Sequence, residues 1–205
     1  MLPLGILVSG RGSNMEAIAE AIEKRELPAR INIVISDRAE AQALERARKR
    51  GLKTFFLNPR DFSTREEYDL ALAQLCLQEG VELVVLAGFM RILTPAFLEK
   101  FPLRVINIHP SLLPAFPGLN AQRQAWEYGV KYSGCTVHFV DEGVDTGPII
   151  AQAVVPVLDH DTPETLAERI LVEEHRLYPQ VIRWLAEGRV KLEGRRVRII
   201  KGEID

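Results

Sequence analysis

The chain has 205 residues, of which 47% are hydrophobic and 26% are charged, and its formal net charge is -2. These values are typical of a folded α/β domain and exclude a strongly basic surface, so neither a nucleic acid nor a membrane is expected as a partner. Two cysteines cannot form a disulfide framework, which favours a cytoplasmic protein. No apolar run approaches the roughly 18 residues of a membrane span, and the N-terminus lacks the basic region of a signal peptide.

The first half of the chain alternates short apolar runs with amphipathic ones. We predict strands over residues 4–9, 30–36, 53–57, 82–87 and 104–109. Helices are predicted over 13–24 and 39–50, from a capping box at 63–66 to residue 80, and in a short segment opening at Thr94-Pro95. Strands that alternate with helices imply right-handed βαβ units and a parallel sheet.

The second half follows a different pattern. Strands predicted over 133–140 and 148–157 are joined by a loop too short for a crossover helix, so they should pair antiparallel. Thr162-Pro163 then opens a helix of about 25 residues with a bend at Pro179, and residues 189–200 read as a hairpin turning near Glu193-Gly194. The predicted fold class is α/β: a three-layer, Rossmann-like fold with a mostly parallel sheet and one antiparallel strand in the C-terminal half.

Ligands of such folds lie beyond the C-terminal ends of the parallel strands. The first strand ends in SGRGSN, where glycines let backbone N–H groups approach an anion at a helix N-terminus. Met15 stands where a dinucleotide fingerprint requires its third glycine, so a single phosphate is the better ligand. A tight turn without any ligand is the alternative.

Two further strand ends carry candidate side chains. GFMRILTP, residues 88–95, exposes apolar groups beside an arginine and predicts either a pocket for a flat organic ligand or ordinary core. In NIHP, the period of two places Asn107 and His109 on one face, and Pro110 holds His109 extended. An amide can stabilise an oxyanion and an imidazole can move a proton. A hydrogen-bonded structural pair is the alternative.

Two carboxylates complete the candidate set. Asp145 lies in a tight turn, where it could favour the charged form of a neighbouring imidazole or bind its own backbone. Glu174 falls inside the apolar stripe of the long helix, so it needs a ligand or an internal ion pair. His138 alternates along its strand and could face the site. The histidines have no metal-ligand spacing, so no metal is predicted.

These stretches together resemble the folate-dependent formyltransferases. GCTVHFVDEGVDTGPII, residues 134–150, is similar to the signature of that family, and LVSGRGSNMEAI, LAGFMRILTPAFL and INIHPSLLPAFPG are similar to members acting on glycinamide ribonucleotide. The resemblance implies transfer of the formyl group of 10-formyltetrahydrofolate to the amine of that ribonucleotide, in purine synthesis, by a monomer or a homodimer. It implies a single domain, 1–205, with a phosphate-binding half at 1–110 and a folate and catalytic half at 111–205.

The resemblance also assigns roles to residues. It implies catalysis by Asn107, His109 and Asp145. It implies that the ribonucleotide is bound by Gly12, Ser13, Asn14 and Glu174. Its folate contacts would be Arg65, Met90, Arg91, Ile92, Leu93, Asn107, Val140, Asp141 and Asp145.

Three other classes of protein are rivals to this interpretation. Methionyl-tRNA formyltransferase carries a further tRNA-binding domain, and this chain ends at Asp205 without a basic excess. Formyltetrahydrofolate deformylase carries an N-terminal regulatory domain, whereas the predicted catalytic fold starts here at residue 2. A non-catalytic nucleotide-binding module would need the glycine loop but not Asn107, His109 and Asp145 together.

Overall fold

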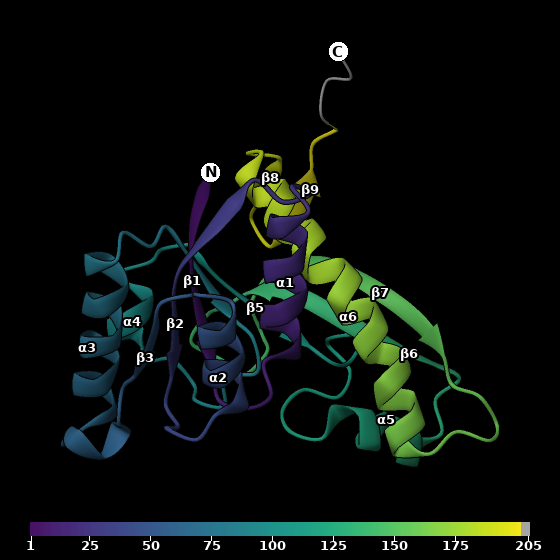
Figure 1. Ribbon diagram of the computed structural model, residues 1–205. Helices are drawn as coiled ribbons and strands as arrows, with labels where there is room; N and C mark the ends of the chain where they lie inside the picture. Colours follow the sequence, from purple (N-terminus) through teal and green to yellow (C-terminus); the bar gives the residue numbers. More distant parts are fainter. Residues whose placement is uncertain (202–205) are drawn as a thin grey trace. The chain divides into compact units, whose positions relative to one another are not determined.

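The computed structural model describes residues 1–201, and the chain divides into two compact units, Met1–Asn107 and the part from Ile108 onward (Figure 1). The division falls inside one strand, β5 (Val105–His109), whereas the sequence placed it after residue 110. That the two form a single domain stays a prediction.

The first unit is built on parallel strands, as predicted. They are β1 (Leu2–Val8), β2 (Ala29–Ser36), β3 (Thr54–Phe56), β4 (Leu83–Leu86) and the start of β5. β1 pairs in parallel with both β2 and β4, β2 with β3, and β4 with β5. The strands read as near-continuous apolar runs because both faces of the sheet are buried.

Five helical segments connect these strands: α1 (Ser13–Glu23), α2 (Gln42–Lys49), the 3-10 turn η1 (Pro59–Asp61), α3 (Arg65–Gln78) and α4 (Pro95–Leu98). The chain moves from β1 through β2 to β3 in one direction and from β4 to β5 in the other. Because crossovers are right-handed, α1 and α2 cover one face of the sheet and α3 and α4 the opposite face (Figure 1). The direction reverses between β1 and β4, which is where open α/β sheets bind ligands.

Three sequence predictions in this unit need correction. α2 begins at Gln42 rather than at residue 39. The cap of α3 is shifted by one residue, because Thr64 rather than Ser63 accepts the hydrogen bond, from the amide of Glu67. At the start of α4, Thr94 occupies the N-cap position without a side-chain cap.

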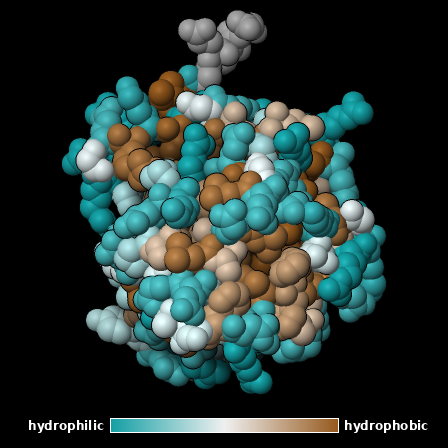
Figure 2. All heavy atoms as spheres, turned by 90° about the vertical axis from the view of Figure 1, so that its left-hand side faces the viewer, coloured by the Kyte–Doolittle hydropathy of each residue, from teal (hydrophilic) through white to brown (hydrophobic). Residues whose placement is uncertain are grey.

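α3 is unusual in being apolar on its outer side as well as its inner one. Leu70 and Leu77 are each 45% exposed, and Figure 2, viewed from the side on which α3 lies in Figure 1, shows apolar side chains gathered on that face. Periodicity therefore says little about α3, and the polar residues before it are the better sequence signal for where it begins.

The second unit contains β6 (Tyr132–Phe139) and β7 (Ile149–Pro156), which pair antiparallel as predicted. Seven strands form one sheet in the order β3-β2-β1-β4-β5-β6-β7. The sheet is mostly parallel, because every pairing from β3 to β5 is parallel. β8 (Val190–Glu193) and β9 (Arg196–Ile199) form the predicted hairpin. The sequence missed α5 (Ala121–Tyr128), a short helix that ends at Gly129 with φ 81°.

α6 (Pro163–Ala186) packs against β6 and β7 and continues through Pro179. A capping box of Thr162 and Thr165 starts it, in agreement with the predicted opening. Glu174 is buried, 7% exposed, on the same helix as buried Ile170 and Tyr178. The helix thus carries a carboxylate into the apolar interior of this unit.

Candidate functional site

In the first unit, the loops after β1 and β4 are joined at the switch point of the sheet. The amide of Ser9 donates to the carbonyl of Gly88 (3.1 Å), and the amide of Met90 donates to the hydroxyl of Ser9 (2.9 Å). That hydroxyl donates in turn to Asp37 (2.6 Å). Two predicted ligand loops, 9–14 and 88–95, are therefore held side by side by hydrogen bonds.

The glycine loop before α1 has a backbone suited to an anion. Gly12 has φ 79°, and no side chain caps the helix, which begins at Ser13. The first amides of a helix have no partner within it and carry a partial positive charge, so they can donate hydrogen bonds to an anion. Ser13 and Asn14, the other two predicted contacts, are half-buried in the first turn.

Gly12 also has a purely structural role. A Cβ there would lie 2.6 Å from the Cβ of Ala43 on α2, so the close approach of α2 requires glycine whether or not a ligand binds. The tight-turn alternative thus accounts for the glycine, and Ser13 becomes the sharper probe of ligand binding.

The predicted folate segment divides into exposed and buried side chains. Met90 is 54% and Ile92 49% exposed, which leaves both apolar groups available to a ligand. Leu93 is buried, at 2% exposure, and belongs to the core. Arg65 donates to the carbonyl of Ile92 (2.8 Å), so this guanidinium does lie beside the segment.

β5 carries the predicted amide and imidazole. Asn107 is half-buried and lies opposite Leu86 of β4, while His109 is 4% exposed at the end of the strand. The alternation along the strand puts both on one face, as the sequence predicts. Pro114, in the following loop, has a cis peptide bond with Leu113.

In the second unit His109 and Asp145 lie together. Nδ1 of His109 is 3.3 Å from Oδ2 of Asp145, and Nε2 is 2.8 Å from the carbonyl oxygen of Phe116. Both ring nitrogens therefore face acceptors. A doubly protonated ring satisfies both contacts, whereas a neutral ring can donate only one hydrogen bond.

Asp145 is held by more than the imidazole. Burial raises the pKa of its carboxyl, but the nearby His138 ring, the amide of Gly118 and the charge of His109 outweigh burial and bring the pKa below its ordinary value. Oδ2 accepts from the amide of Gly118 (2.8 Å), and Oδ1 lies 3.7 Å from Nε2 of His138. The group is a stable carboxylate at neutral pH.

The turn that carries Asp145 is organised by a second aspartate. Asp141 accepts from the amide of Gly143 (3.1 Å) and from the hydroxyl of Thr146 (2.6 Å), and Asp145 itself adopts φ 54°. Asp141 and Val140, both predicted folate contacts, are half-buried. Asp141 thus shapes the turn, and Asp145 points to the histidines rather than to its own backbone.

Glu174 lies near β6. Burial raises the pKa of the Cys135 thiol to about 12, and the charge of Glu174 adds to that effect. The sequence correctly placed this carboxylate inside the apolar stripe of the helix. Its assignment to a ligand remains a prediction.

Sequence reasoning underrated His138 and missed the backbone groups of Phe116 and Gly118. The alternation of His138 with Thr136 was the available signal for the first, but nothing in the residue letters points to the two loop peptides. Residues 1–201 contain no group of three or more His, Cys, Asp or Glu side chains arranged to hold a metal. Within the same range, no helix is long and apolar enough to cross a membrane.

Comparison with known proteins adds a family. A model described as formyl transferase matches residues 4–182. The chain is 45% identical over 187 residues to the phosphoribosylglycinamide formyltransferase of Escherichia coli (strain K12), covering 91% of this chain and 88% of that protein. It is 46% identical over 191 residues, 92% of this chain, to the trifunctional purine biosynthetic protein adenosine-3 of Chironomus tentans, of which it spans 14%. The crystal structure of glycinamide ribonucleotide transformylase 1 from Symbiobacterium toebii matches with a TM-score of 0.97 and 55% identity, covering 98% of this chain and 95% of that one.

Proposed function

The chain belongs to the formyl transferase family, and on that premise we propose that it transfers the formyl group of 10-formyltetrahydrofolate to the amine of glycinamide ribonucleotide. The observation that carries this proposal is the buried imidazole of His109, which faces the Asp145 carboxylate at the end of β5. The products are N-formylglycinamide ribonucleotide and tetrahydrofolate. The reaction belongs to purine synthesis in the cytoplasm.

The ribonucleotide phosphate is assigned to Gly12, Ser13 and Asn14. The uncapped start of α1 supports this, because no side chain caps its first amides and they can donate hydrogen bonds to an anion. Glu174 is assigned to the glycinamide part, since an amine-bearing substrate is a suitable partner for a carboxylate that the helix buries.

The folate is assigned to two sets of residues. In the first unit these are Arg65, Met90, Arg91, Ile92, Leu93 and Asn107. In the second they are Val140, Asp141 and Asp145. The exposure of Met90 and Ile92 supports a flat apolar ligand there, whereas buried Leu93 can take part only through its backbone.

Asn107 and His109 stabilise the charge that develops during transfer. The substrate amine attacks the formyl carbon, and the carbonyl oxygen becomes an oxyanion that an amide N–H and a protonated imidazole can hold. His109 then gives a proton to the folate nitrogen as the bond from that nitrogen to the formyl carbon breaks. The amine nitrogen loses a proton to solvent and His109 regains one from solvent, so atoms and charges balance over the cycle.

The contacts of His109 define what the reaction requires of the ring. Nδ1 faces Asp145, so the proton for the substrate comes from Nε2, which must exchange its contact with the carbonyl of Phe116. Asp145 is the positioning partner, because its carboxylate favours the cationic ring. No covalent intermediate with the protein is needed.

The test is a formyl-transfer assay with purified protein and 10-formyltetrahydrofolate, run with and without glycinamide ribonucleotide. We expect tetrahydrofolate to be released only when the ribonucleotide is present, with equal formation of the formylated product. Release without the ribonucleotide would indicate a deformylase. Absence of turnover with either would reject the proposal.

A further inference from the structure

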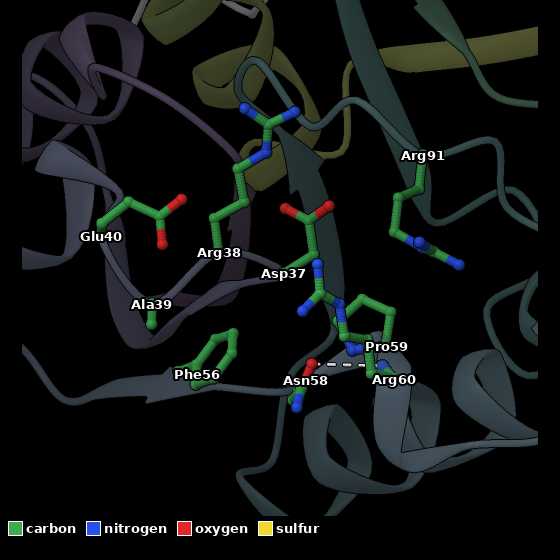
Figure 3. Close-up of a pocket in the computed structure, with 9 residues that line it drawn as sticks. All are labelled: Asp37, Arg38, Ala39, Glu40, Phe56, Asn58, Pro59, Arg60 and Arg91. Carbon is green, nitrogen blue, oxygen red and sulfur yellow. Dashed lines mark hydrogen bonds between the residues drawn. The ribbon is translucent and has the colours of Figure 1, made fainter.

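The first unit contains a cavity of about 550 Å³ beyond the C-terminal ends of β2 and β3, and Figure 3 shows its lining side chains. Arg91 is among them, so this cavity adjoins segment 90–93 and forms part of the folate site already proposed. The second unit contains a smaller cavity of about 350 Å³, to which the proposed reaction assigns no residue. Its lining residues are Ile149, Arg195, Arg196, Val197 and Arg198.

This smaller cavity lies where the β8–β9 hairpin meets the turn that carries Asp145. Ile149 is the first residue of β7 and directly follows that turn, residues 141–148. The other lining residues belong to the tip of the hairpin and to β9, which packs against β7. The hairpin and the turn are therefore neighbours in space, although 49 positions separate Arg195 from Thr146.

The hairpin presents Arg195 toward the turn. Glu193 pairs with Arg196, so Gly194 and Arg195 are the two central residues of a tight connection. Gly194 has φ 61°, as the first central residue of a type II′ turn requires. Within residues 1–201, the exposed Arg195 side chain has no ion pair with a carboxylate. Its guanidinium donates instead to the carbonyl of Thr146 (2.5 Å).

Thr146 directly follows Asp145 and is held from two sides. Its hydroxyl donates to Asp141 (2.6 Å), inside the turn, and its carbonyl accepts from Arg195, outside the turn. Thr146 is exposed, and Asp145 adopts φ 54°, a conformation that costs energy for any residue other than glycine. Contacts from outside the turn therefore help to keep Asp145 in the conformation that faces His109.

We propose that Arg195 is a positioning residue for the proposed reaction, because by holding the carbonyl of Thr146 it keeps the Asp145 carboxylate directed at His109. The inference rests on the proposed function and deepens it. A hydrogen bond from a charged guanidinium is stronger and more directional than one between neutral groups. Arg195 is not among the groups that chiefly set the pKa of Asp145, so its effect is transmitted by the backbone rather than by its charge.

The first test compares the kinetics of Arg195→Ala and Arg196→Ala. We expect Arg195→Ala to lower kcat about tenfold, because a less firmly held group spends less time in the productive geometry. The KM for the ribonucleotide should stay unchanged, since none of its assigned contacts lies on the turn. Both arginines are exposed, so both variants should fold normally.

Arg196→Ala is the matched control. It removes the same charge from the next residue of the hairpin, which within residues 1–201 has no hydrogen bond to the turn. It should keep the full kcat. An equal loss in both variants would mean that only the charge of the hairpin matters and would overturn the proposal.

A double-mutant cycle with Asp145→Asn determines whether Arg195 acts through Asp145. If it does, adding Arg195→Ala to Asp145→Asn should lower kcat by less than about twofold, because the carboxylate to be positioned is already absent. Losses that multiply in the double variant would mean that Arg195 acts independently of Asp145 and would overturn the proposal.

A spectroscopic measurement needs no turnover. The ring proton on Nδ1 of His109, which faces Asp145 at 3.3 Å, should give a downfield resonance in proton NMR of the free protein. Arg195→Ala should broaden this resonance or shift it upfield, whereas Arg196→Ala should leave it in place. If the unsubstituted protein does not formylate the ribonucleotide, the proposed function fails, but the resonance still decides whether Arg195 positions the pair. An unmoved resonance in Arg195→Ala would overturn the proposal.

Discussion

Asp145 is the residue whose role the geometry makes most testable. Its carboxylate faces His109 at 3.3 Å and His138 at 3.7 Å, and it accepts the amide of Gly118. We predict that Asp145→Asn lowers kcat by at least about 100-fold, or about 2.7 kcal/mol, because the amide cannot stabilise a cationic ring in the transition state. KM should change little. The measurement is steady-state kinetics with both substrates.

A control for Asp145→Asn is Asp159→Asn, which removes a fully exposed loop carboxylate. It should leave kcat unchanged. If Asp145→Asn retained kcat within about tenfold, Asp145 would be a turn residue and its contact with His109 would be incidental.

Ser13 tests the phosphate loop better than Gly12 does. A side chain at Gly12 would collide with Ala43 and disturb the packing of α1 against α2, so loss of binding there would be ambiguous. Ser13→Ala removes one hydroxyl donor at the start of the helix. We expect the KM for the ribonucleotide to rise about tenfold, the effect of one lost hydrogen bond to a charged group, while folate binding is unaffected. A rise in the folate KM alone would refute the assignment of the loop.

Substitution of Glu174 distinguishes a ligand-binding role of this carboxylate from a structural one. Glu174→Gln keeps the shape of the buried side chain and removes its charge. We predict a raised KM for the ribonucleotide with an unchanged melting temperature. The opposite result, a stability loss of about 3 kcal/mol with an unchanged KM, would identify a buried structural ion pair.

At the scale of the element, the loop between β5 and α5 joins the two groups that the proposed mechanism needs. The carbonyl of Phe116 accepts from His109, and the amide of Gly118 donates to Asp145. Thr136 on β6 also holds the loop, since its hydroxyl donates to the carbonyl of Ser111 (2.7 Å) and accepts from the amide of Leu113 (3.1 Å). One short segment thus contacts both His109 and Asp145, the two side chains that the proposed mechanism pairs.

Gly118→Ala tests this segment. Gly118 has φ 82°, and a Cβ there would meet nothing within 4 Å, so the cost is backbone strain of about 1 kcal/mol. Gly129 has φ 81° and equally open surroundings at the end of α5. We predict a similar loss of stability from Gly118→Ala and Gly129→Ala in thermal unfolding, with about a tenfold loss of kcat in the former only. Equal kcat values would show that the loop does not position the site.

The elements could be predicted where local chemistry decides them. Buried parallel strands appear as apolar runs, so β1, β2 and β4 were found within two residues of their bounds. The start of α3 was displaced by one residue because Ser63 and Thr64 both offer a hydroxyl, and Glu66 and Glu67 both follow at the required distance. Only the backbone geometry chooses between them.

At the scale of the whole molecule, the contacts that sequence reasoning missed are those that backbone groups make between segments far apart in the chain. The amide of Gly118 reaches Asp145 across 27 positions. The proximity of His138 to Asp145 depends on the course of the turn after β6. Such contacts follow from packing and register, which no single segment encodes. The candidate residues were therefore predictable from the sequence, but the backbone groups that hold them were not.

Two buried aspartates give the stability of the protein opposite responses to pH. Asp161 accepts two hydrogen bonds from Arg169 (2.7 and 2.9 Å), and these, with the amide of Leu158, hold the pKa of its carboxyl well below its usual range despite burial. For Asp69, burial dominates and raises the pKa, against a hydrogen bond from the amide of Thr94. Because an unfolded aspartate titrates near about 3.9, these opposite shifts imply opposite linkage to pH.

A group with a lowered folded pKa contributes stability that is present above the unfolded pKa and is lost as pH falls through the folded one. We therefore predict that Asp161→Asn lowers the melting temperature at pH 7 and that the deficit shrinks below about pH 4. A raised folded pKa has the reverse effect, because the ionised form is the one that burial penalises. The melting temperature of Asp69→Asn, taken relative to that of the unsubstituted protein, should consequently be higher at pH 7 than at pH 4. Calorimetric melting from pH 3 to pH 7 measures both differences, and a deficit for Asp161→Asn that is independent of pH would mean that its ion pair with Arg169 does not stabilise the fold.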